Sequence, residues 1–202
     1  MFVQVIHGRV TDADALRRRS ELWDQELKPG AEGFLGSTIG VSNDGVMYVI
    51  ARFSSEDAAR RNSDRPEQDR WWQETARHLE GEVSFHDSTD VQLMRDGGSD
   101  DAGFVQVIHG RAQDIDRLRE LNDQADQWLN EYRPDVIGGI TAWHQGGLFT
   151  EVVYFTSEEE ARAGEKRMVA DSKEVRAQLE EWSSLVEDPE YTDLSEPWTS
   201  SP

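Results

Sequence analysis

The sequence predicts an α+β protein that contains two tandem copies of one domain. The octapeptide FVQVIHGR occupies residues 2–9 and returns letter for letter at residues 104–111, an offset of 104 − 2 = 102. The same offset aligns the two halves over about sixty residues without an insertion. A repeat of this length that occurs only twice indicates two complete domains, because solenoid units are shorter and need three or more copies. Each copy has the same order of predicted elements: strand, helix, strand, strand, helix, strand.

Each copy opens with a strand that leads into a helix. Residues 2–7 and 104–109 are rich in β-branched and aromatic side chains, and a glycine follows each run. Asp12 and Asp114 are suitable N-caps for the helices that come next. Apolar residues then recur at helical spacing in both copies, and Pro134 closes the second of these helices.

A β-hairpin follows in each copy. Strands at 34–42 and 46–53 flank an Asp-Gly turn, and strands at 137–144 and 148–155 flank a Gly-Gly turn. Glycine at these points indicates a tight hairpin, because such turns need a positive φ angle.

The second helix and the last strand complete the repeat. Ser55 and Ser157, each followed by acidic residues, are expected to cap the second helix. In the first copy, Pro66 starts a further helical piece that we expect to reach Leu79. We expect the last strand at residues 83–94, with a weaker counterpart at 191–198. This order is the ferredoxin-like βαββαβ arrangement, in which both helices cover one face of a four-stranded antiparallel sheet.

The other face of each sheet is also expected to be buried. Residues 46–51 and 152–155 are almost continuously apolar rather than alternating, which is typical of strands covered on both faces. We therefore expect the two sheets to pack face to face into an intrachain α+β barrel, so that the chain is a monomer with an internal pseudo-dimer. The expected ranges are 1–95 and 104–198 for the two domains and 96–103 for a flexible linker.

Composition excludes several classes of function. The chain has 41 acidic and 21 basic residues and a net charge of −20, which disfavours binding to nucleic acid or anionic lipid. It has no apolar run near the roughly 18 residues that a membrane span needs, and we expect a cytoplasmic protein. It has no cysteine, no metal-ligand spacing, no phosphate-binding loop and no serine nucleophile elbow. We therefore expect neither a metal nor a bound cofactor.

Three segments together resemble a known superfamily. They are residues 2–9, the FSSEDAAR transition at 53–60 and the Ser63–Pro66 break before Trp71 and Trp72. This pattern resembles the dimeric α+β barrel superfamily, and within it the antibiotic biosynthesis monooxygenase (ABM)-like group, here as a tandem fusion. The resemblance spans nearly the whole chain. It implies a cavity between each sheet and its helices, in a superfamily of cofactor-independent oxygenases, haem-degrading enzymes, isomerases and proteins without established activity.

Polar residues at matching positions of the first strands are candidate site residues. Gln4 and Gln106 interrupt an apolar strand, and a buried amide needs hydrogen-bond partners. They either line a cavity or bridge strand and helix structurally. His7 and His109 are possible acids or bases near neutral pH, or structural residues at a strand end. Strand parity places each histidine on the face opposite the preceding glutamine.

The helical segment of the first copy supplies a second group of candidates. Asn62, Trp71, Trp72 and His78 are polar or aromatic, and the seven-residue spacing predicts Trp71 and His78 on one helical face. Such residues could clamp a planar ligand, or they could simply pack the core. The second copy has Gly164, Lys173, Glu174 and Glu180 at the matching positions, so only the first copy is expected to keep this site.

Three strand residues are further candidates for binding a ligand. Glu151 lies within an apolar strand, where a carboxylate needs a partner or a raised pKa. Arg52 and Tyr154 occupy equivalent positions in the two copies. A salt bridge at the strand edge is the alternative interpretation of these residues.

The leading hypothesis is a small-molecule oxygenase or ligand-binding protein of the ABM-like type, acting on an aromatic or polyketide-like ligand without a prosthetic group. In the oxygenase interpretation a histidine, His78 or His7, deprotonates the substrate, and O₂ reacts with the stabilised carbanion. One tryptophan, Trp71 or Trp72, stacks on the ligand, and an amide, Asn62 or Gln4, stabilises the oxyanion. The alternative is a non-catalytic binding or stress-related module with a filled barrel. A haem-degrading monooxygenase is the least favoured hypothesis.

Overall fold

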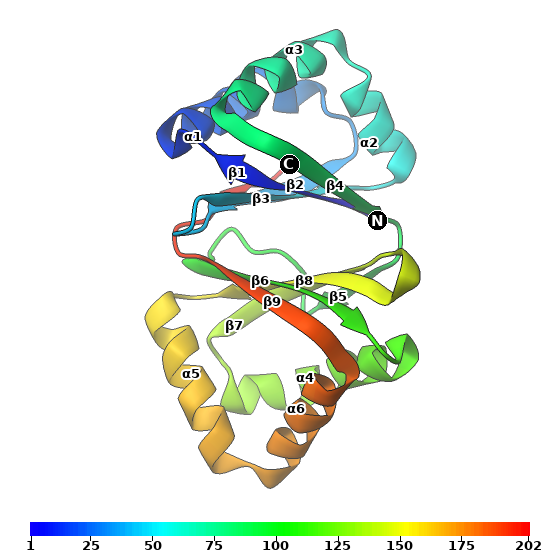
Figure 1. Cartoon of the computed structure of the whole chain (residues 1–202), viewed down its shortest axis with the longest axis vertical. Coiled ribbons are helices and arrows are strands. Elements are labelled where there is room, and N and C mark those ends of the chain that lie inside the picture. The colour runs from blue at the N-terminus through cyan, green and yellow to red at the C-terminus, as the bar shows by residue number, and fades with distance from the viewer. The chain divides into compact units, whose positions relative to one another are not determined.

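The computed structural model describes the backbone of residues 1–202 and the side chains of residues 1–167 and 172–202. The chain divides into two compact units. Unit 1 comprises Met1–Thr89 and Pro197–Pro202, and unit 2 comprises Asp90–Glu196. Each unit contains one antiparallel sheet and its own helices (Figure 1).

The sheet of unit 1 has five strands in the order β10-β2-β3-β1-β4. The strands are β1 (Phe2–Val10), β2 (Phe34–Val41), β3 (Val46–Phe53), β4 (Leu79–Ser88) and β10 (Trp198–Ser200). All neighbouring strands are antiparallel. The hairpin between β2 and β3 confirms the Asp-Gly turn, in which Gly45 has a φ of +78°.

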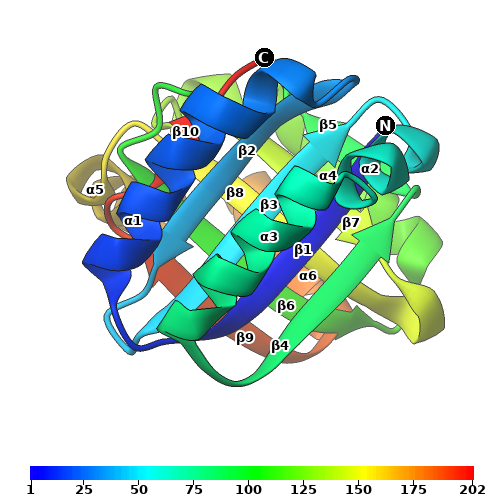
Figure 2. The same cartoon turned by 90° about the horizontal axis from the view of Figure 1, so that it is seen from above.

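The helices of unit 1 lie over one face of this sheet, as Figure 2 shows from above. They are α1 (Ala13–Leu22), α2 (Glu56–Ser63) and α3 (Pro66–Thr75), with a π-helical turn at Trp23–Leu27 and 3₁₀ turns at Lys28–Gly30 and Ala76–His78. The Asp12 and Ser55 side chains accept hydrogen bonds from the first turns of α1 and α2, as predicted. Pro66 occupies the first turn of α3, where its missing N–H costs nothing.

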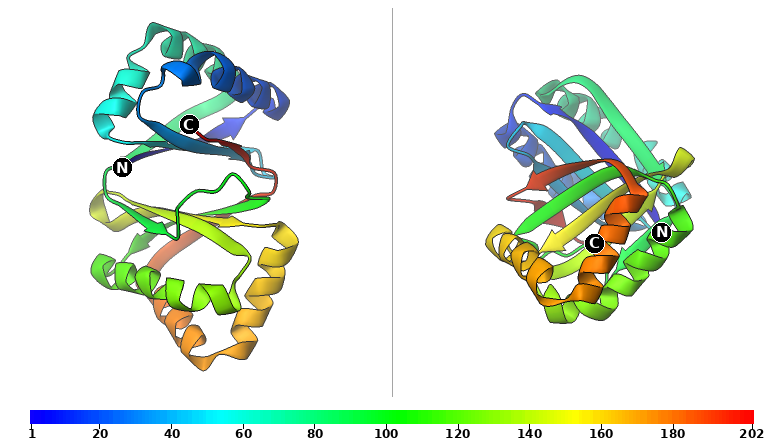
Figure 3. Two further views of the ribbon diagram at one scale, coloured as in Figure 1. Left: turned by 180° about the vertical axis from the view of Figure 1, so that it is seen from behind. Right: turned by 60° about the horizontal axis from the view of Figure 1, so that its bottom comes forward.

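Unit 2 repeats this plan with strands in the order β5-β7-β8-β6-β9. The strands are β5 (Val91–Met94), β6 (Phe104–Ala112), β7 (Val136–Trp143), β8 (Leu148–Phe155) and β9 (Val186–Leu194). The helices are α4 (Ile115–Tyr132), α5 (Glu158–Asp171) and α6 (Lys173–Leu185), and they cover one face of the sheet (Figure 3). Gly146 and Gly147 have φ angles of +72° and +80° in the predicted second hairpin.

The sheets have five strands rather than the predicted four, because each unit receives a short strand from beyond its own repeat. The single strand expected at 83–94 is in fact two, since β4 ends at Ser88 and β5 pairs with β7 of unit 2. The strand expected at 191–198 is also divided, because β9 ends at Leu194 and β10 pairs with β2 of unit 1. The compact units therefore do not coincide with the two sequence repeats.

The expected linker, residues 96–103, belongs to unit 2 and contacts the rest of that unit at two points. Gly97 lies so close to Gly138 of β7 that a Cβ on Gly138 would collide with the Gly97 carbonyl oxygen. The backbone N–H of Gly103 donates to the carbonyl oxygen of Phe155 at 3.1 Å. The close approach explains why the start of β7 has a glycine in place of a side chain.

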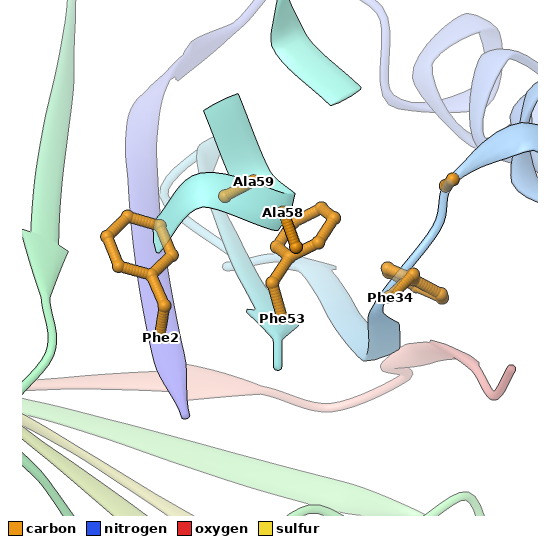
Figure 4. Close-up of a cluster of buried hydrophobic side chains, with 6 residues drawn as sticks. Phe2, Phe34, Phe53, Ala58 and Ala59 are labelled. Carbon is orange, nitrogen blue, oxygen red and sulfur yellow. The ribbon is translucent and has the colours of Figure 1, made fainter. Parts of the chain in front are cut away.

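Separate apolar clusters hold the helices of each unit against its sheet. In unit 1, Phe2, Phe34 and Phe53 pack around Ala58 and Ala59 of α2 (Figure 4). In unit 2, the equivalent cluster contains Phe104, Val136, Phe155, Ala161 and Leu129. None of the helices in the described part of the chain combines the length and the apolar character that a membrane crossing requires.

Candidate functional site

A cavity of about 290 Å³ lies between the sheet and the helices of unit 1. Its floor is formed by residues of the three central strands that point toward the helices: Gln4, Ile6, Ile39, Val49 and Ala51. Its walls come from α1, the π-helical turn, α2 and α3, and Phe85 of β4 lies at one side. This is the place where the resemblance to ABM-like proteins implies a cavity.

Three tryptophans form the aromatic walls of the cavity. The Trp71 Nε1–H donates to the Arg19 carbonyl oxygen at 2.9 Å, and Arg19 Nη2 donates back to the Trp71 carbonyl oxygen at 3.1 Å. Trp23 Nε1 donates to Gln68 Oε1 at 2.8 Å. Trp72 packs edge-on against Phe85, with ring centroids 5.5 Å apart. Trp71 and Trp23 are therefore held as fixed walls, because their N–H groups already have partners.

Three of the polar side chains that line the cavity are amides: Gln4, Asn62 and Gln68. Asn62 is buried, and its Oδ1 accepts from Arg65 Nη1 at 3.0 Å. Gln4 Nε2 donates to Asp87 Oδ1 at 2.9 Å. Because these contacts occupy one end of each amide, Asn62 and Gln68 keep an NH₂ group for a ligand and Gln4 keeps a carbonyl oxygen.

The cavity is almost free of ionisable groups. Asp69 is the only ionisable residue of its lining, and its side chain is exposed at the rim, where it accepts a hydrogen bond from Gln73 at 2.8 Å. Among the residues that the structure describes, no arginine, lysine or histidine lines the cavity. Within the described residues, no group of three or more histidine or acidic side chains could hold a metal ion. The geometry therefore suits an uncharged ligand.

The structure does not bring the predicted histidines into this cavity. α3 ends at Thr75, and His78 lies in the 3₁₀ turn beyond it, so the predicted helical face shared by Trp71 and His78 does not form. The carbonyl oxygen of His78 accepts a hydrogen bond from Thr11 N–H at 2.9 Å. The prediction that α3 reaches Leu79 is wrong, because β4 already begins there.

His7 belongs to a row of rings on the other face of the sheet of unit 1, as strand parity predicted. It pairs with Tyr48, whereas Gln4 pairs with the cavity residue Ala51. The His7 ring stacks on Tyr48 and on His86, with centroid distances of 5.4 Å in both cases. The Nε2 atoms of His7 and His86 are 3.3 Å apart. His7 therefore does not line the cavity.

Arg52 and Tyr154 also lie away from the helices of their units. Arg52 pairs with Val3, and Tyr154 pairs with Val105 at the same position of the second repeat. Arg52 packs against Gly36 of β2, and Tyr154 is fully buried. Neither residue lines the cavity of unit 1.

The candidates of unit 2 form contacts of two kinds. Gln106 Nε2 donates to Asp193 Oδ1 at 2.9 Å, which repeats the contact between Gln4 and Asp87 in unit 1. His109 Nδ1 lies 3.0 Å from Thr150 Oγ1, and His144 Nε2 lies 3.0 Å from the same oxygen. The histidines of β6 and of the β7–β8 hairpin thus share one threonine hydroxyl.

An ion pair that the sequence analysis missed takes the place of the Asn62 amide in unit 2. Gly164 matches Asn62, and the side chains of Arg133 and Asp135 lie against it. This pair is buried, with Arg133 Nη2 at 2.8 Å from Asp135 Oδ2. The sequence signal was two opposite charges on either side of Pro134 at the end of α4.

Replacing Gly164 with alanine is expected to destabilise unit 2 by about 1–3 kcal/mol, because overpacking forces neighbouring groups to move. The new Cβ would lie 2.5 Å from Arg133 Nε and 2.7 Å from Asp135 Oδ1. Urea denaturation measures the loss. In an Arg133→Ala background the same substitution should cost less, and an unchanged cost would show that the pair does not occupy this space.

Glu151 is buried in β8 and has no hydrogen bond or ion pair among the described residues. The alternative of a salt bridge at the strand edge is therefore wrong. Burial raises the pKa of this carboxyl to about 7, which is the other outcome that the sequence suggested.

No known family profile matches the sequence, and no curated protein matches it. Solved structures do resemble it over the whole chain. A candidate monooxygenase from Lactobacillus acidophilus has a TM-score of 0.71 at 14% identity and covers 99% of both chains. A candidate monooxygenase from Fusobacterium nucleatum has a TM-score of 0.72 at 10% identity, covering 99% of this chain and 94% of its own.

An anthrone oxidase-like protein is also similar, with a TM-score of 0.68 at 11% identity, covering 99% of this chain and 92% of its own. At these identities the likeness concerns the fold. The chain therefore shares the α+β fold of these three proteins, with two ferredoxin-like units in tandem.

Proposed function

We propose that unit 1 binds a small, planar, uncharged aromatic molecule in its cavity. The observation that carries this proposal is the cavity of about 290 Å³, walled by Trp23, Trp71 and Trp72. That volume is at the lower end of the roughly 300–1,000 Å³ of small-molecule pockets. An open cavity of this kind favours a ligand over the alternative of a non-catalytic module whose interior is filled by its own side chains.

The polar groups indicate what the ligand carries at its edges. The NH₂ groups of Asn62 and Gln68 can donate to a carbonyl oxygen, and the Gln4 carbonyl oxygen can accept from a hydroxyl group. A hydroxylated aromatic ketone, as in polyketide-like compounds, has both features. The absence of basic residues from the lining argues against a carboxylate or phosphate ligand.

Oxygenation of that ligand is the second candidate function, supported by the likeness to the anthrone oxidase-like protein. In such a reaction the substrate loses a proton to a base, and the resulting carbanion adds O₂ to form a peroxide anion. The peroxide takes up a proton, and loss of water from this hydroperoxide leaves a ketone. The amides of Asn62 and Gln68 would stabilise the negative oxygen of the deprotonated substrate. The geometry gives no support to His78 or His7 as the base, and Asp69 is the only ionisable group of the lining.

Haem degradation has less support than either function. The lining of the cavity contains no histidine that could bind the iron of a haem, and His78 lies outside it. The residues present therefore do not fit this cofactor.

Replacing Trp72 with alanine is expected to weaken the binding of anthrone by about tenfold. Loss of the ring removes stacking and buried aromatic area, which together are worth more than about 1 kcal/mol. Quenching of tryptophan fluorescence under argon would measure the affinity. The matched control is Trp128→Ala in unit 2, whose indole N–H donates to Gln178. Equal losses in both variants would contradict a site in unit 1.

Replacing Asn62 with aspartate is expected to weaken the same binding by about tenfold or more, because it removes the NH₂ donor and adds a charge. The variant keeps the shape of the side chain and its contact with Arg65. Asn130→Asp, at an exposed position of α4, is the control. Unchanged affinity in Asn62→Asp would overturn the assigned role of this amide.

An oxygen electrode separates the two candidate functions. Oxygenation would be supported if the native chain were required for anthrone to consume O₂, and if the rate of this consumption were lower with the Asn62→Asp variant. Binding without O₂ consumption would leave the ligand-binding function and exclude oxygenation of this compound.

We also propose that the chain is located in the cytoplasm, and that it is a monomer because the repeat places two copies of the fold in one polypeptide. Light scattering is expected to give a mass near 23.0 kDa. A mass of twice that value would contradict this proposal.

A further inference from the structure

Glu151 lies in the middle of β8, on the side of the sheet that faces the helices of unit 2. Its cross-strand neighbours are Ile108 of β6 and Thr141 of β7. Ile108 packs against Leu118 of α4, which fixes the orientation of this row of side chains. Glu151 is 6% exposed, yet no described residue makes a hydrogen bond or an ion pair with its carboxyl group. A buried carboxyl without a partner is costly, so its presence requires an explanation.

The position of Glu151 corresponds to the cavity of unit 1. The offset of 102 residues matches Glu151 with Val49, Thr141 with Ile39, and Gln106 with Gln4, and each of these unit 1 residues lines the cavity. The edge strands agree, because Tyr191 pairs with Ile108 as Phe85 pairs with Ile6. Unit 2 therefore has the carboxyl of Glu151 and the hydroxyl groups of Thr141 and Tyr191. Unit 1 has the apolar side chains of Val49, Ile39 and Phe85 at the corresponding positions.

Uncharged polar and aromatic groups lie next to Thr141, the cross-strand neighbour of Glu151. Thr141 Oγ1 accepts from Asn122 Nδ2 at 3.5 Å, and Asn122 Oδ1 accepts from Trp182 Nε1 at 3.2 Å. The charge of Glu151 contributes to the raised pKa of Tyr191, so the two side chains are near each other, although burial is the larger cause. Tyr191 is 56% exposed, which leaves an open side to the cluster. The described residues thus provide no cation for Glu151, but they do provide aromatic surfaces.

We propose that Glu151 is the acidic group of a second ligand site, in unit 2, that takes a small aromatic amine in its protonated form. The ammonium group would donate to the Glu151 carboxylate and to the Thr141 hydroxyl oxygen. The ring would lie against Trp182 and Tyr191, whose faces also attract a cation. The net charge of −20 favours the approach of a cation to the chain. This site is independent of the function proposed for unit 1.

Binding of the amine should depend on pH. Burial raises the pKa of Glu151 to about 7, so the ionised fraction increases from about one tenth at pH 6 to about nine tenths at pH 8. The charged or titratable groups on this face include Tyr191 and Asp193 of β9, and Arg162 of α5, which is ion-paired with Asp193. Thr141 of β7, Ile108 of β6, Asn122 of α4 and Trp182 of α6 are uncharged. The affinity is therefore expected to increase about ninefold between pH 6 and pH 8.

The test uses 2-phenylethylamine as the probe and 2-phenylethanol as its neutral match. Each is titrated into the full chain at pH 6 and pH 8, while NMR follows the indole N–H of Trp182 and the side-chain amide of Asn122. We expect the amine to shift both signals, more strongly at pH 8, and the alcohol to shift neither. Equal binding of the two probes, or no binding of the amine at millimolar concentration, would overturn the proposal.

Glu151→Gln tests the role of the carboxylate, and it should lower the affinity for the amine by at least tenfold. Glu190→Gln removes the same charge from an exposed position of β9 and should leave the affinity unchanged. Thr141→Val keeps the carboxylate and should weaken binding severalfold while the pH dependence remains. Binding by Glu151→Gln as strong as that of the native chain would overturn the proposal, as would pH dependence retained in this variant.

Discussion

Replacing Arg133 with alanine is expected to lower the free energy of unfolding of unit 2 by about 3–5 kcal/mol, because it leaves the Asp135 carboxylate buried without a counter-ion. The two side chains are 7% and 2% exposed. Arg133 Nε donates to both Asp135 oxygens at 3.2 and 3.1 Å, and Nη2 also reaches the Ala161 carbonyl oxygen at 3.4 Å. The guanidinium further lies over the Phe155 ring, at 5.3 Å from its centroid. Urea denaturation would measure the loss.

Two variants separate the buried pair from a general effect of arginine. Arg61→Ala, at an exposed position of α2, should change the stability by less than about 0.5 kcal/mol. The double variant Arg133→Met/Asp135→Leu should recover most of the loss, since a buried ion pair can be replaced by apolar side chains at little cost. A double variant as unstable as Arg133→Ala would show that the shape of the arginine, rather than its charge, is what matters.

The local features of the fold could be predicted from the sequence because they depend on short-range physics. The hairpins follow from glycine at positions with positive φ, as Gly45 and Gly146 show. The helix starts follow from Asp12, Ser55 and Pro66, whose capping roles the structure confirms. These features involve residues only a few positions apart along the chain.

The exchange of short strands between the two sequence repeats could not be predicted in the same way. β5 begins only three residues after the end of β4, and the residues of both segments are compatible with one continuous strand. The pairing of β5 with β7 joins segments about fifty residues apart, and that of β10 with β2 joins segments near opposite ends of the chain. Local patterns do not specify such long-range partners.

The candidate site could be predicted only where it depends on local sequence patterns. Gln4 and Asn62 line the cavity, and so do both Trp71 and Trp72, of which the sequence predicted one as the stacking wall. His78 was misplaced because the α-helix stops early. At that point Thr75 is buried, and its hydroxyl donates to the Trp71 carbonyl oxygen at 2.8 Å. A short 3₁₀ turn then changes the direction of the following side chains, which the seven-residue spacing could not reveal.

Replacing Glu151 with glutamine is expected to stabilise unit 2 relative to the native chain as the pH rises from about 4.5 to 7. Burial raises the pKa of Glu151 in the folded chain to about 7, above its ordinary value of 4.5. Between these values the folded native chain holds a proton that the unfolded chain has lost, so its stability falls as the pH rises. One pKa unit is worth about 1.4 kcal/mol, so the total loss is about 3 kcal/mol. The glutamine variant has no such proton and should not show this loss.

The measurement is the difference in free energy of unfolding between variant and native chain at several pH values from 4 to 8. Taking the difference cancels the contributions of the other titrating groups to the pH dependence of stability, because the two proteins share these groups. Glu151→Leu serves as the control, because it lacks the same proton but changes the packing. The leucine and glutamine variants should differ in their free energy of unfolding. For both variants, however, the difference in this free energy from the native chain should change with pH by the same slope. A difference that stays flat from pH 4 to 8 in both variants would mean that the Glu151 carboxylate is already stabilised in the folded chain, and the raised pKa would then be wrong.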